Sequence, residues 1–315
     1  MAEKKKIIAV GANPAWQKVL QFKSLFPGEV NRADKMWAFA SGKGINFVRA
    51  ANCWGIAEAE VVQFAGGDNG KLLLADLEKE HLKCKTFPVN VPTRCCTTLL
   101  SVLDSKMTEI IEPSQAPEPA AESAALEYIK AASVNVDGAA LCGQLPTGMS
   151  MDFYSKTVQT FVQQGKPVLI DSYKNIAEVL PFCQNGILKI NAEELRALCG
   201  IKDTALGIKR LFTKLPLACI AITDGAGKAY FGNGRDIYTY NIPEVPEVVN
   251  PVGSGDTVSA VFFSEYLAGT APEQAFACGL AAASANCTSM KCGEYDRALA
   301  EKLLAKINIQ QTLNL

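Results

Sequence analysis

The sequence predicts an α/β protein whose central, mostly parallel sheet is covered by helices on both faces. From Ala121 onward, short apolar segments typical of strands alternate with longer segments that have helical spacing. Strands and helices that alternate in this way form βαβ units, which build parallel sheets with two buried faces. The strand-like segments are 139–142, 168–170, 187–190 and 219–222, and the helical ones are 154–164, 193–199 and 205–215.

The N-terminal third adds a strand, a helix and two stretches that fit neither. Residues 7–10 are uniformly apolar, as expected of a strand buried on both faces, and 45–54 have helical spacing that ends at Gly55. Residues 14–41 and 93–111 show no helical period, and we expect them to form a small β-sheet lid. The expected division is a core of residues 1–12, 42–90 and 113–315 with a discontinuous lid of residues 13–41 and 91–112.

Composition narrows the class of protein. Of the 315 residues, 49% are hydrophobic, which is enough for a sizeable core. The formal net charge is −1, so neither nucleic acid nor an anionic membrane is an expected partner. Eleven scattered cysteines without a CxxC pair are typical of reduced, mostly buried thiols, and the first apolar run is too short for a signal peptide. We therefore expect a cytoplasmic protein.

The segment 250–269 is the strongest candidate for an active centre. Its apolar residues recur at helical spacing up to Gly269, which suits the left-handed position after a helix end. The start of a helix presents unpaired N–H groups and a partial positive charge, and glycine lets a phosphate approach the backbone. An anion site is therefore predicted in the first turn, which contains Gly253, Ser254 and Gly255.

Asp256 follows directly, although a carboxylate beside such amides repels the ligand that they attract. One interpretation is a general base, which takes a proton from an attacking hydroxyl while the amides hold the charge of a transferred phosphoryl group. The other is a helix cap, since Asp is favoured in the first turn of any helix. The spacing alone favours neither.

Two further groups of polar residues are candidates for ligand contacts. At the expected start of the first helix, a lysine adds its charge to free backbone N–H groups, in the set Gly42, Lys43 and Asn46. A glycine-rich turn with a solvated lysine is the alternative there. Arg32 and Arg94 carry forked guanidinium groups that suit a phosphate, but by themselves they are ordinary surface arginines.

The carboxyl ends of parallel strands, where ligands of such sheets bind, hold another set. The residues at or just past these ends are Asp171, Lys189, Asn191 and Thr223. Asn191 and Glu194 are suited to binding magnesium, and Lys189 is suited to contacting the phosphates of a nucleotide. The alternative is that Asn191 is only the N-cap of a helix with an acidic first turn. Thr223 and Gly225 belong either to a nucleotide-binding turn or to a plain hairpin.

Together these motifs resemble the PfkB family of ribokinase-like sugar kinases over nearly the whole chain. Gly253-Ser254-Gly255-Asp256 resembles the family's GAGD signature. The segment 41–46 resembles the GGKGxN of the hexose-phosphate branch, which includes 1-phosphofructokinase and tagatose-6-phosphate kinase. The segment 189–194 resembles KPNxxE. No Gly-x-x-x-x-Gly-Lys-Ser/Thr sequence occurs, so a P-loop is excluded.

The resemblance implies a ribokinase-like three-layer sandwich and an ATP-dependent kinase with Mg²⁺ as cofactor. It makes Asp256 the base and 253–255 the anion turn. It brings Arg32 and Arg94 to the phosphate that the acceptor already carries, beside Gly42, Lys43 and Asn46. The nucleotide then contacts Lys189, Asn191, Thr223, Gly225 and Gly255, and the magnesium contacts Asn191 and Glu194, directly or through water.

Three positions on the acceptor side depart from the family pattern. Gln17 stands where the branch has Asp, Gln144 where it has Ser, and Ser41 where it has Gly. An amide accepts at its oxygen and donates from its nitrogen, so Gln17 favours a different hydroxyl pattern from that of a carboxylate. Because Asp256 and its turn are intact, we expect retained phosphoryl transfer with an altered sugar pocket.

The expected activity is phosphorylation of a sugar phosphate, most like fructose 1-phosphate to fructose 1,6-bisphosphate. Tagatose 6-phosphate, fructose 6-phosphate, and a free sugar or nucleoside are alternative acceptors. A catalytically idle protein that binds a nucleotide or sugar phosphate is the alternative from another class. Lids of this family often pair, so a homodimer through the lid is a candidate assembly.

Overall fold

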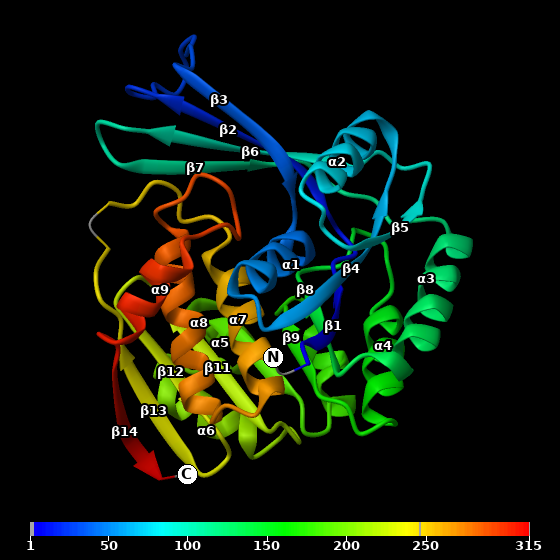
Figure 1. Cartoon of the computed structure of the whole chain (residues 1–315), viewed down its shortest axis with the longest axis vertical. Helices are drawn as coiled ribbons and strands as arrows, with labels where there is room; N and C mark the ends of the chain where they lie inside the picture. Colours follow the sequence, from blue (N-terminus) through cyan, green and yellow to red (C-terminus); the bar gives the residue numbers. More distant parts are fainter. Residues whose placement is uncertain (1–2, 246, 315) are drawn as a thin grey trace.

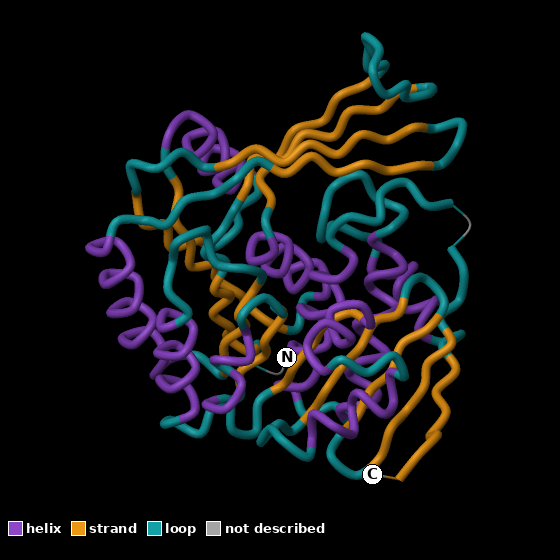
Figure 2. The backbone as a smooth tube through the Cα atoms, turned by 180° about the vertical axis from the view of Figure 1, so that it is seen from behind, coloured by secondary structure: helices purple, strands orange, loops and turns teal. Residues whose placement is uncertain are grey.

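The computed structural model, which describes residues 3–245 and 247–314, contains one large and one small sheet, with helices on both faces of the large one (Figure 1 and Figure 2). The large sheet has the strand order β14-β13-β12-β11-β10-β9-β8-β1-β4-β5, and the small one has the order β3-β2-β6-β7. The predicted α/β fold with a central, mostly parallel sheet and a small separate sheet is confirmed.

The parallel part of the large sheet contains every strand that the sequence analysis expects there. Its members are β1 (Lys5–Val10), β4 (Ala57–Ala65), β5 (Cys84–Pro88), β8 (Gly138–Cys142), β9 (Val168–Asp171), β10 (Ile187–Asn191) and β11 (Cys219–Asp224). An antiparallel extension that the sequence analysis does not predict follows at one edge, formed by β12 (Lys228–Gly232), β13 (Asp236–Asn241) and β14 (Asn308–Asn314).

Two hydrophobic clusters separate the helices into layers. Along β1, Ile7 and Ala9 pack into one cluster while Ile8 and Val10 pack into the other, because successive strand residues point to opposite faces. The first cluster includes α1 (Lys43–Trp54), α2 (Gly67–Lys79), α7 (Ser254–Ala268), α8 (Pro272–Asn286) and α9 (Arg297–Leu304). The second includes α3 (Pro119–Ala132), α4 (Asp152–Val162), α5 (Ala192–Cys199) and α6 (Thr204–Phe212). Short 3₁₀ turns occur at Ser133–Asn135, Ile176–Glu178 and Leu180–Phe182.

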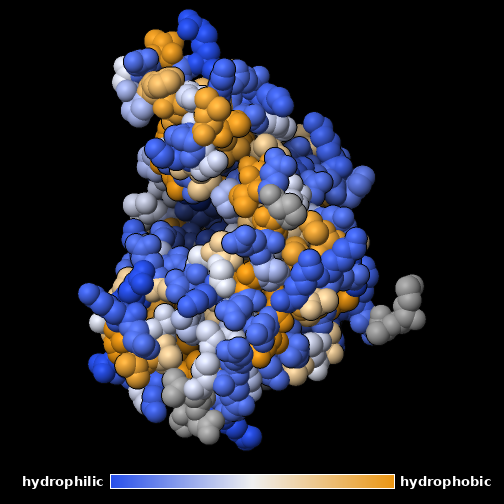
Figure 3. Space-filling view, turned by 90° about the vertical axis from the view of Figure 1, so that its left-hand side faces the viewer, coloured by the Kyte–Doolittle hydropathy of each residue, from blue (hydrophilic) through white to orange (hydrophobic). Residues whose placement is uncertain are grey.

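The small sheet is built from the two stretches without helical period. Its strands are β2 (Ala15–Phe22), β3 (Lys35–Ser41), β6 (Arg94–Ser101) and β7 (Lys106–Ile111), with β2 parallel to β6 and the other pairs antiparallel. It extends away from the main body to loops at its tip (Figure 2), and the surface is hollowed between the two (Figure 3).

Two further observations concern the cysteines and the helices. All eleven cysteines are free, as their scatter in the sequence predicts. Among residues 3–245 and 247–314, no helix has the length and apolar character needed to cross a bilayer.

A buried arginine joins the root of the small sheet to the core. Arg49 of α1 is 4% exposed, and its Nε and Nη2 donate to both carboxylate oxygens of Glu80, at 2.7 and 3.0 Å. Its Nη2 also donates to the Ala40 carbonyl of β3 at 2.8 Å, and its Nη1 to the Cys292 carbonyl at 2.6 Å. One guanidinium therefore ties together α1, the end of α2, the lid strand β3 and the loop after α8.

We predict that Arg49→Ala lowers the free energy of unfolding by about 3 kcal/mol, because it leaves Glu80 with Lys291 as its remaining cation and removes the guanidinium donor from two buried carbonyls. Urea denaturation monitored by circular dichroism measures this change. The matched control is Lys71→Ala, which removes an exposed ion pair with Asp68 and should leave the urea midpoint unchanged. Equal midpoints for the two variants would contradict the assignment.

Candidate active site

The predicted site residues converge at the carboxyl edge of the parallel strands, under the small sheet. The start of α1 supplies Lys43 and Asn46, the ends of β9 and β10 supply Asp171 and Lys189, and the start of α7 supplies Asp256. Because parallel strands end at the same edge of a sheet, residues far apart in the sequence meet there.

The turn before α7 has the predicted helix start, and its backbone shape depends on one glycine. Gly253 is the N-cap residue with φ of 84°, a left-handed conformation that glycine adopts readily. A Cβ atom at this position would lie 2.7 Å from the Cβ of Cys292, so the close packing also requires glycine. The first-turn amides of Gly255 and Asp256 have no carbonyl partner inside the helix, as an anion site requires, whereas the Ser254 amide donates to the Pro251 carbonyl at 3.3 Å.

Asp256 is buried, with 7% of its surface exposed, and it does not cap its helix. Instead, its Oδ2 accepts a hydrogen bond from Asn46 Nδ2 at 2.8 Å, and Lys43 Nζ lies 4.0 Å from its Oδ1. Burial raises the pKa of Asp256 to about 6, and the nearby charge of Asp171 adds to the rise while Lys43 and Asn46 oppose it. The helix-cap alternative is therefore wrong, and the carboxyl group has the pKa range of a base near neutral pH.

Asp171 is a second buried carboxylate with much stronger partners. It is 2% exposed, and its Oδ1 lies 2.8 Å from Lys43 Nζ. Its Oδ2 accepts from Ser259 Oγ at 2.6 Å and lies 3.4 Å from Lys189 Nζ. Burial alone would raise the pKa of Asp171, but Lys189 and Lys43 outweigh it and lower the pKa to about 2. In the sequence, the only signal for Asp171 is its place at the end of a strand, which indicates no role.

The two lysines lie beside the anion turn. Lys189 Nζ donates to the Gly255 carbonyl at 2.9 Å, which fixes the ammonium group at the first turn of α7. Lys43 reaches between Asp171 and Asp256 from the start of α1. Two cations therefore lie beside the start of α7.

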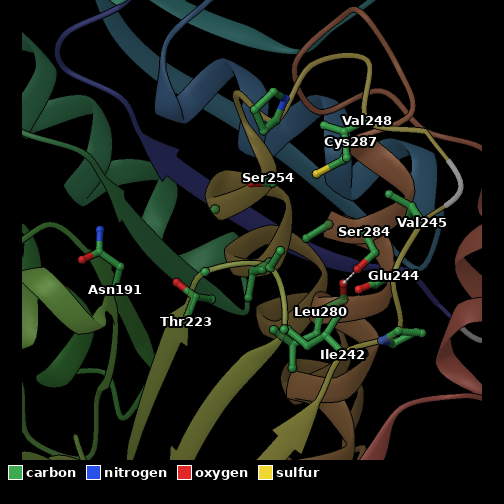
Figure 4. Close-up of a pocket in the computed structure, with 18 of the residues that line it drawn as sticks. Asn191, Thr223, Ile242, Glu244, Val245, Val248, Ser254, Leu280, Ser284 and Cys287 are labelled. Atoms are coloured by element: carbon green, nitrogen blue, oxygen red, sulfur yellow. Dashed lines mark hydrogen bonds between the residues drawn. The ribbon is translucent and has the colours of Figure 1, made fainter. Parts of the chain in front are cut away.

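A cavity of about 730 Å³, the size of a small-molecule pocket, opens beside this turn (Figure 4). Among its lining residues are the members of the predicted nucleotide set, namely Lys189, Asn191, Glu194, Thr223, Gly225 and Gly255. In Figure 4, Asn191 and Thr223 lie on one side, and Ile242, Val245 and Leu280 lie on the other.

The apolar wall of this cavity was missed by sequence reasoning. It comes from the segment after β13 and from one side of α8, and it includes Ile242, Val245, Val248, Leu280, Ala283 and Cys287. Its only signal in the sequence is an apolar segment with prolines before the anion turn, which resembles an ordinary connecting loop.

At two places in the nucleotide set, the structure shows the local structural alternative, a helix cap at Asn191 and a hairpin at Thr223. Asn191 Oδ1 accepts from the Glu194 amide at 2.8 Å, and Glu194 Oε2 accepts from the Asn191 amide at 2.9 Å, which is a capping box. Thr223 and Gly225 lie at a hairpin in which Asp224 pairs with Lys228. Because all four residues also line the cavity, a local structural role does not exclude contact with a ligand.

The acceptor-side substitutions make contacts of their own. Gln17 is buried, and its Nε2 donates to Thr98 Oγ1 at 2.9 Å and to the Lys18 carbonyl at 3.3 Å. The amide hydrogens are thus used within the small sheet, contrary to the expectation that Gln17 donates to a ligand. Ser41 Oγ donates to Asn46 Oδ1 at 3.1 Å, whereas Gln144 is exposed in the loop after β8.

The two candidate phosphate ligands lie at opposite ends of the small sheet. Arg94 pairs with Ala15 at the root, while Arg32 is exposed in the loop at the tip, where Lys35 pairs with Gln21. Along β2, the position that pairs with Arg94 and the position next to the tip loop are six residues apart, or roughly 20 Å. The prediction that the fold brings both arginines to one phosphate is therefore wrong within a single chain.

Arg94 itself has an incomplete set of partners. Its Nη2 donates to the Asn13 carbonyl at 3.1 Å, but its Nε is buried without a hydrogen-bond partner among the residues that the structure describes. Arg94 and Cys96 lie on the face of the sheet that carries Gln17, because Cys96 pairs with Gln17 and alternate residues share a face.

The chain is similar in sequence and structure to known sugar kinases. The sequence pattern of the pfkB family carbohydrate kinases matches residues 4–297. A candidate phosphofructokinase from Staphylococcus aureus is 26% identical, with a TM-score of 0.78 over 98% of this chain and 100% of that one.

Two more distant structures share the fold. Phosphofructokinase-2 from Escherichia coli is 18% identical, with a TM-score of 0.86 over 96% of this chain and 99% of that one. A possible 1-phosphofructokinase from Thermotoga maritima is 18% identical, with a TM-score of 0.84 over 98% of this chain and 100% of that one. With the family pattern spanning nearly its whole length, this chain belongs to the PfkB family of carbohydrate kinases and is an ATP-dependent kinase of a sugar or sugar phosphate.

Proposed function

We propose that this kinase phosphorylates a hexose phosphate, with fructose 1-phosphate as the foremost candidate and fructose 1,6-bisphosphate as its product. The observation that carries this proposal is the buried, unpartnered Nε of Arg94 on the lid face that carries Gln17. An unpaired buried donor is costly, and a phosphate oxygen of the acceptor would satisfy it through a charge-assisted bond. A free sugar offers no group of that kind.

In the proposed reaction, Asp256 takes the proton from the attacking hydroxyl of the sugar. The hydroxyl oxygen forms a bond to the γ-phosphorus of ATP while the bond from that phosphorus to the β–γ bridging oxygen breaks, which releases ADP. The first-turn amides of α7, Lys43 and Lys189 hold the negative charge that spreads over the transferred group.

The residues of the cavity wall fit the Mg²⁺ that such kinases use. Mg²⁺ keeps several waters and needs only one or two carboxylates besides the nucleotide phosphates. We propose Glu194, with Asn191 beside it, as this ligand set, either directly or through water. When bound, the ion neutralises charge on the β- and γ-phosphates.

The relatives support a phosphorylated acceptor without deciding which one. Escherichia coli phosphofructokinase-2 has been solved with fructose 6-phosphate, so that sugar and tagatose 6-phosphate are the alternatives to fructose 1-phosphate. Gln17 presents an uncharged acceptor oxygen where the branch has a carboxylate. A sugar hydroxyl would therefore bind there without charge assistance.

The test of the proposed function is a coupled ADP-release assay over fructose 1-phosphate, fructose 6-phosphate, tagatose 6-phosphate, fructose and ribose. We expect kcat/KM of at least ~10⁴ M⁻¹s⁻¹ with one phosphorylated hexose, which lies within the usual enzyme range. Comparable turnover of a free sugar would favour the alternative acceptor class, and no ADP release with any sugar would favour an idle binding protein.

We predict that Asp256→Asn lowers kcat by at least ~10²-fold with little change in ATP affinity, because a base acts on the acceptor proton rather than on ground-state nucleotide binding. Steady-state kinetics and nucleotide titration measure the two effects. The matched control is Asp152→Asn, an exposed first-turn aspartate of α4, which should leave kcat unchanged. Near-normal turnover in well-folded Asp256→Asn would reject the base.

We predict that Arg94→Ala raises KM for the sugar phosphate by at least ~10-fold with kcat and the KM for ATP nearly unchanged, since a remote phosphate contact is uniform binding. Initial-rate kinetics with each substrate varied in turn provide the measurement. Arg210→Ala, an exposed arginine of α6, is the control and should change neither KM. An unchanged sugar-phosphate KM in the Arg94 variant would exclude that residue as the ligand.

We also propose a homodimer through the small sheet. Met36 of β3 and Ile110 of β7 are 63% and 54% exposed on the same face of that sheet, opposite the Gln17 face. Sedimentation equilibrium should give the mass of two chains, and Met36→Glu with Ile110→Glu should reduce it to one. The control Leu206→Glu, which changes an exposed leucine of α6, should not. A single-chain mass for the unmodified protein would end this proposal.

A further inference from the structure

Four charged side chains, of which Lys43 is partly exposed, meet in the site, and their pairing is uneven. Asp171 takes the close contacts, at 2.8 Å from Lys43 Nζ and 3.4 Å from Lys189 Nζ. Asp256 keeps one more distant cation, Lys43 at 4.0 Å, and one neutral donor, Asn46. Two carboxylates therefore share two lysines, and the closer ion pairs are those of Asp171.

The partners of Asp171 are themselves held in place. Lys189 also donates to the Gly255 carbonyl, and Ser259 Oγ donates to Asp171 Oδ2 from one turn further along α7. The backbone carbonyl of Asp171 accepts from the Gly143 amide at 2.8 Å. Asp171 is thus bonded to α1, β10, α7 and the loop after β8. Among the described residues, no hydrogen bond joins Asp171 to Asp256.

We propose that Asp171 is a positioning residue of this kinase: it holds the ammonium groups of Lys43 and Lys189 at the anion turn and denies Asp256 a close ion pair. Two consequences follow from the geometry. The lysines are presented to the phosphates in one fixed arrangement, which is the preorganisation that stabilises a transition state. Asp256 keeps its affinity for a proton, because no cation among residues 3–245 and 247–314 lies closer to it than 4.0 Å.

The pKa directions agree with this division of roles. Asp171 has its pKa lowered to about 2 by Lys189 and Lys43 against the effect of burial, whereas burial and the charge of Asp171 raise the pKa of Asp256 to about 6. Environments that push two neighbouring carboxyl groups apart in pKa mark different roles in catalysis.

The charged groups with the largest effect on Asp256, together with two nearby thiols, come from several elements packed against it. Burial raises the pKa of the nearby thiols Cys142, of β8, and Cys292, after α8, so both stay neutral between pH 5 and 8. The remaining groups are Lys43 from α1, Asp171 from β9 and Lys189 from β10. The charge of Asp171 is therefore the one nearby negative charge among them that a substitution can remove.

The first test uses the unmodified protein and needs no turnover. Carbon-detected NMR of ¹³C-labelled aspartate follows both carboxyl groups with pH, with the Asp256 signal assigned by its loss in Asp256→Asn. We expect Asp256 to titrate near pH 6 while Asp171 stays ionised to below pH 4. Titration of Asp171 near pH 6 with Asp256 ionised throughout would overturn the proposal.

The second test removes the charge of Asp171. In Asp171→Asn, Lys43 is released toward Asp256, so the pKa of the base falls and activity persists to lower pH. We expect the acidic limb of kcat/KM for the sugar substrate to move down by about one pH unit and kcat at the plateau to fall by at least ~10-fold, because a weaker base transfers the proton less well.

Asp171→Glu is the matched variant, since it keeps the charge and should keep the acidic limb within about 0.3 pH unit of the original, well below the one-unit shift expected for the neutral variant. A purely structural Asp171 predicts lower thermal stability in both variants with an unmoved acidic limb. That result would overturn the proposal. If Asp171→Asn is insoluble, the NMR titration of the unmodified protein tests the proposal instead.

The proposal rests on Asp256 as the base, and the experiments separate the two ideas. Full turnover by Asp256→Asn would reject Asp256 as the base, while the NMR titration of Asp256, compared between the unmodified protein and Asp171→Asn, still reports whether Asp171 sets its proton affinity.

Discussion

The ion pairs of the buried Asp171 carboxylate are the constraint on which the site depends. Moving a charge from water into a protein interior is costly unless it is paired and hydrogen-bonded, and Asp171 meets that requirement with two lysines and a serine. Buried ion pairs of this kind add little to net stability compared with apolar residues of similar size. Their presence at the strand ends is better explained by the need to fix two cations beside a helix start.

A second buried charge connects the base to the small sheet. Asn46 Oδ1 accepts from Ser41 Oγ at 3.1 Å and from Arg49 Nη1 at 3.3 Å, which orients the amide so that its nitrogen faces Asp256. Arg49 is in turn held by Glu80 and by the Ala40 carbonyl at the root of β3. The strand β3, the helix α1 and the Asp256 carboxylate therefore share one hydrogen-bonded chain, so the root of the small sheet and the proposed base are positioned together.

Much of the fold could be predicted because its patterns are local. The buried strand at 7–10, the helix that ends at Gly55 and the helix that ends at Gly269 each follow from apolar spacing and a terminal glycine. The antiparallel extension could not be predicted in the same way. Strand β14 is the last strand of the chain and is far in sequence from β13, the strand with which it pairs. Its sequence is polar enough to resemble a C-terminal tail. Only pairing with β13 makes a strand of it.

By itself, the sequence determined the chemistry that is available: the glycine-rich turn before α7, the carboxylate that follows it, and the lysines and amides at helix and strand ends. Tertiary structure alone decided how these groups divide the work. In the folded chain the close cations pair with Asp171, and Asp256 has a raised pKa. Both hydrogens of the Gln17 amide are bonded inside the small sheet, and Arg32 lies far from Arg94. The physical reason is that propensity and spacing act over a few residues, whereas burial, charge pairing and strand register depend on groups that the fold brings together from distant parts of the chain.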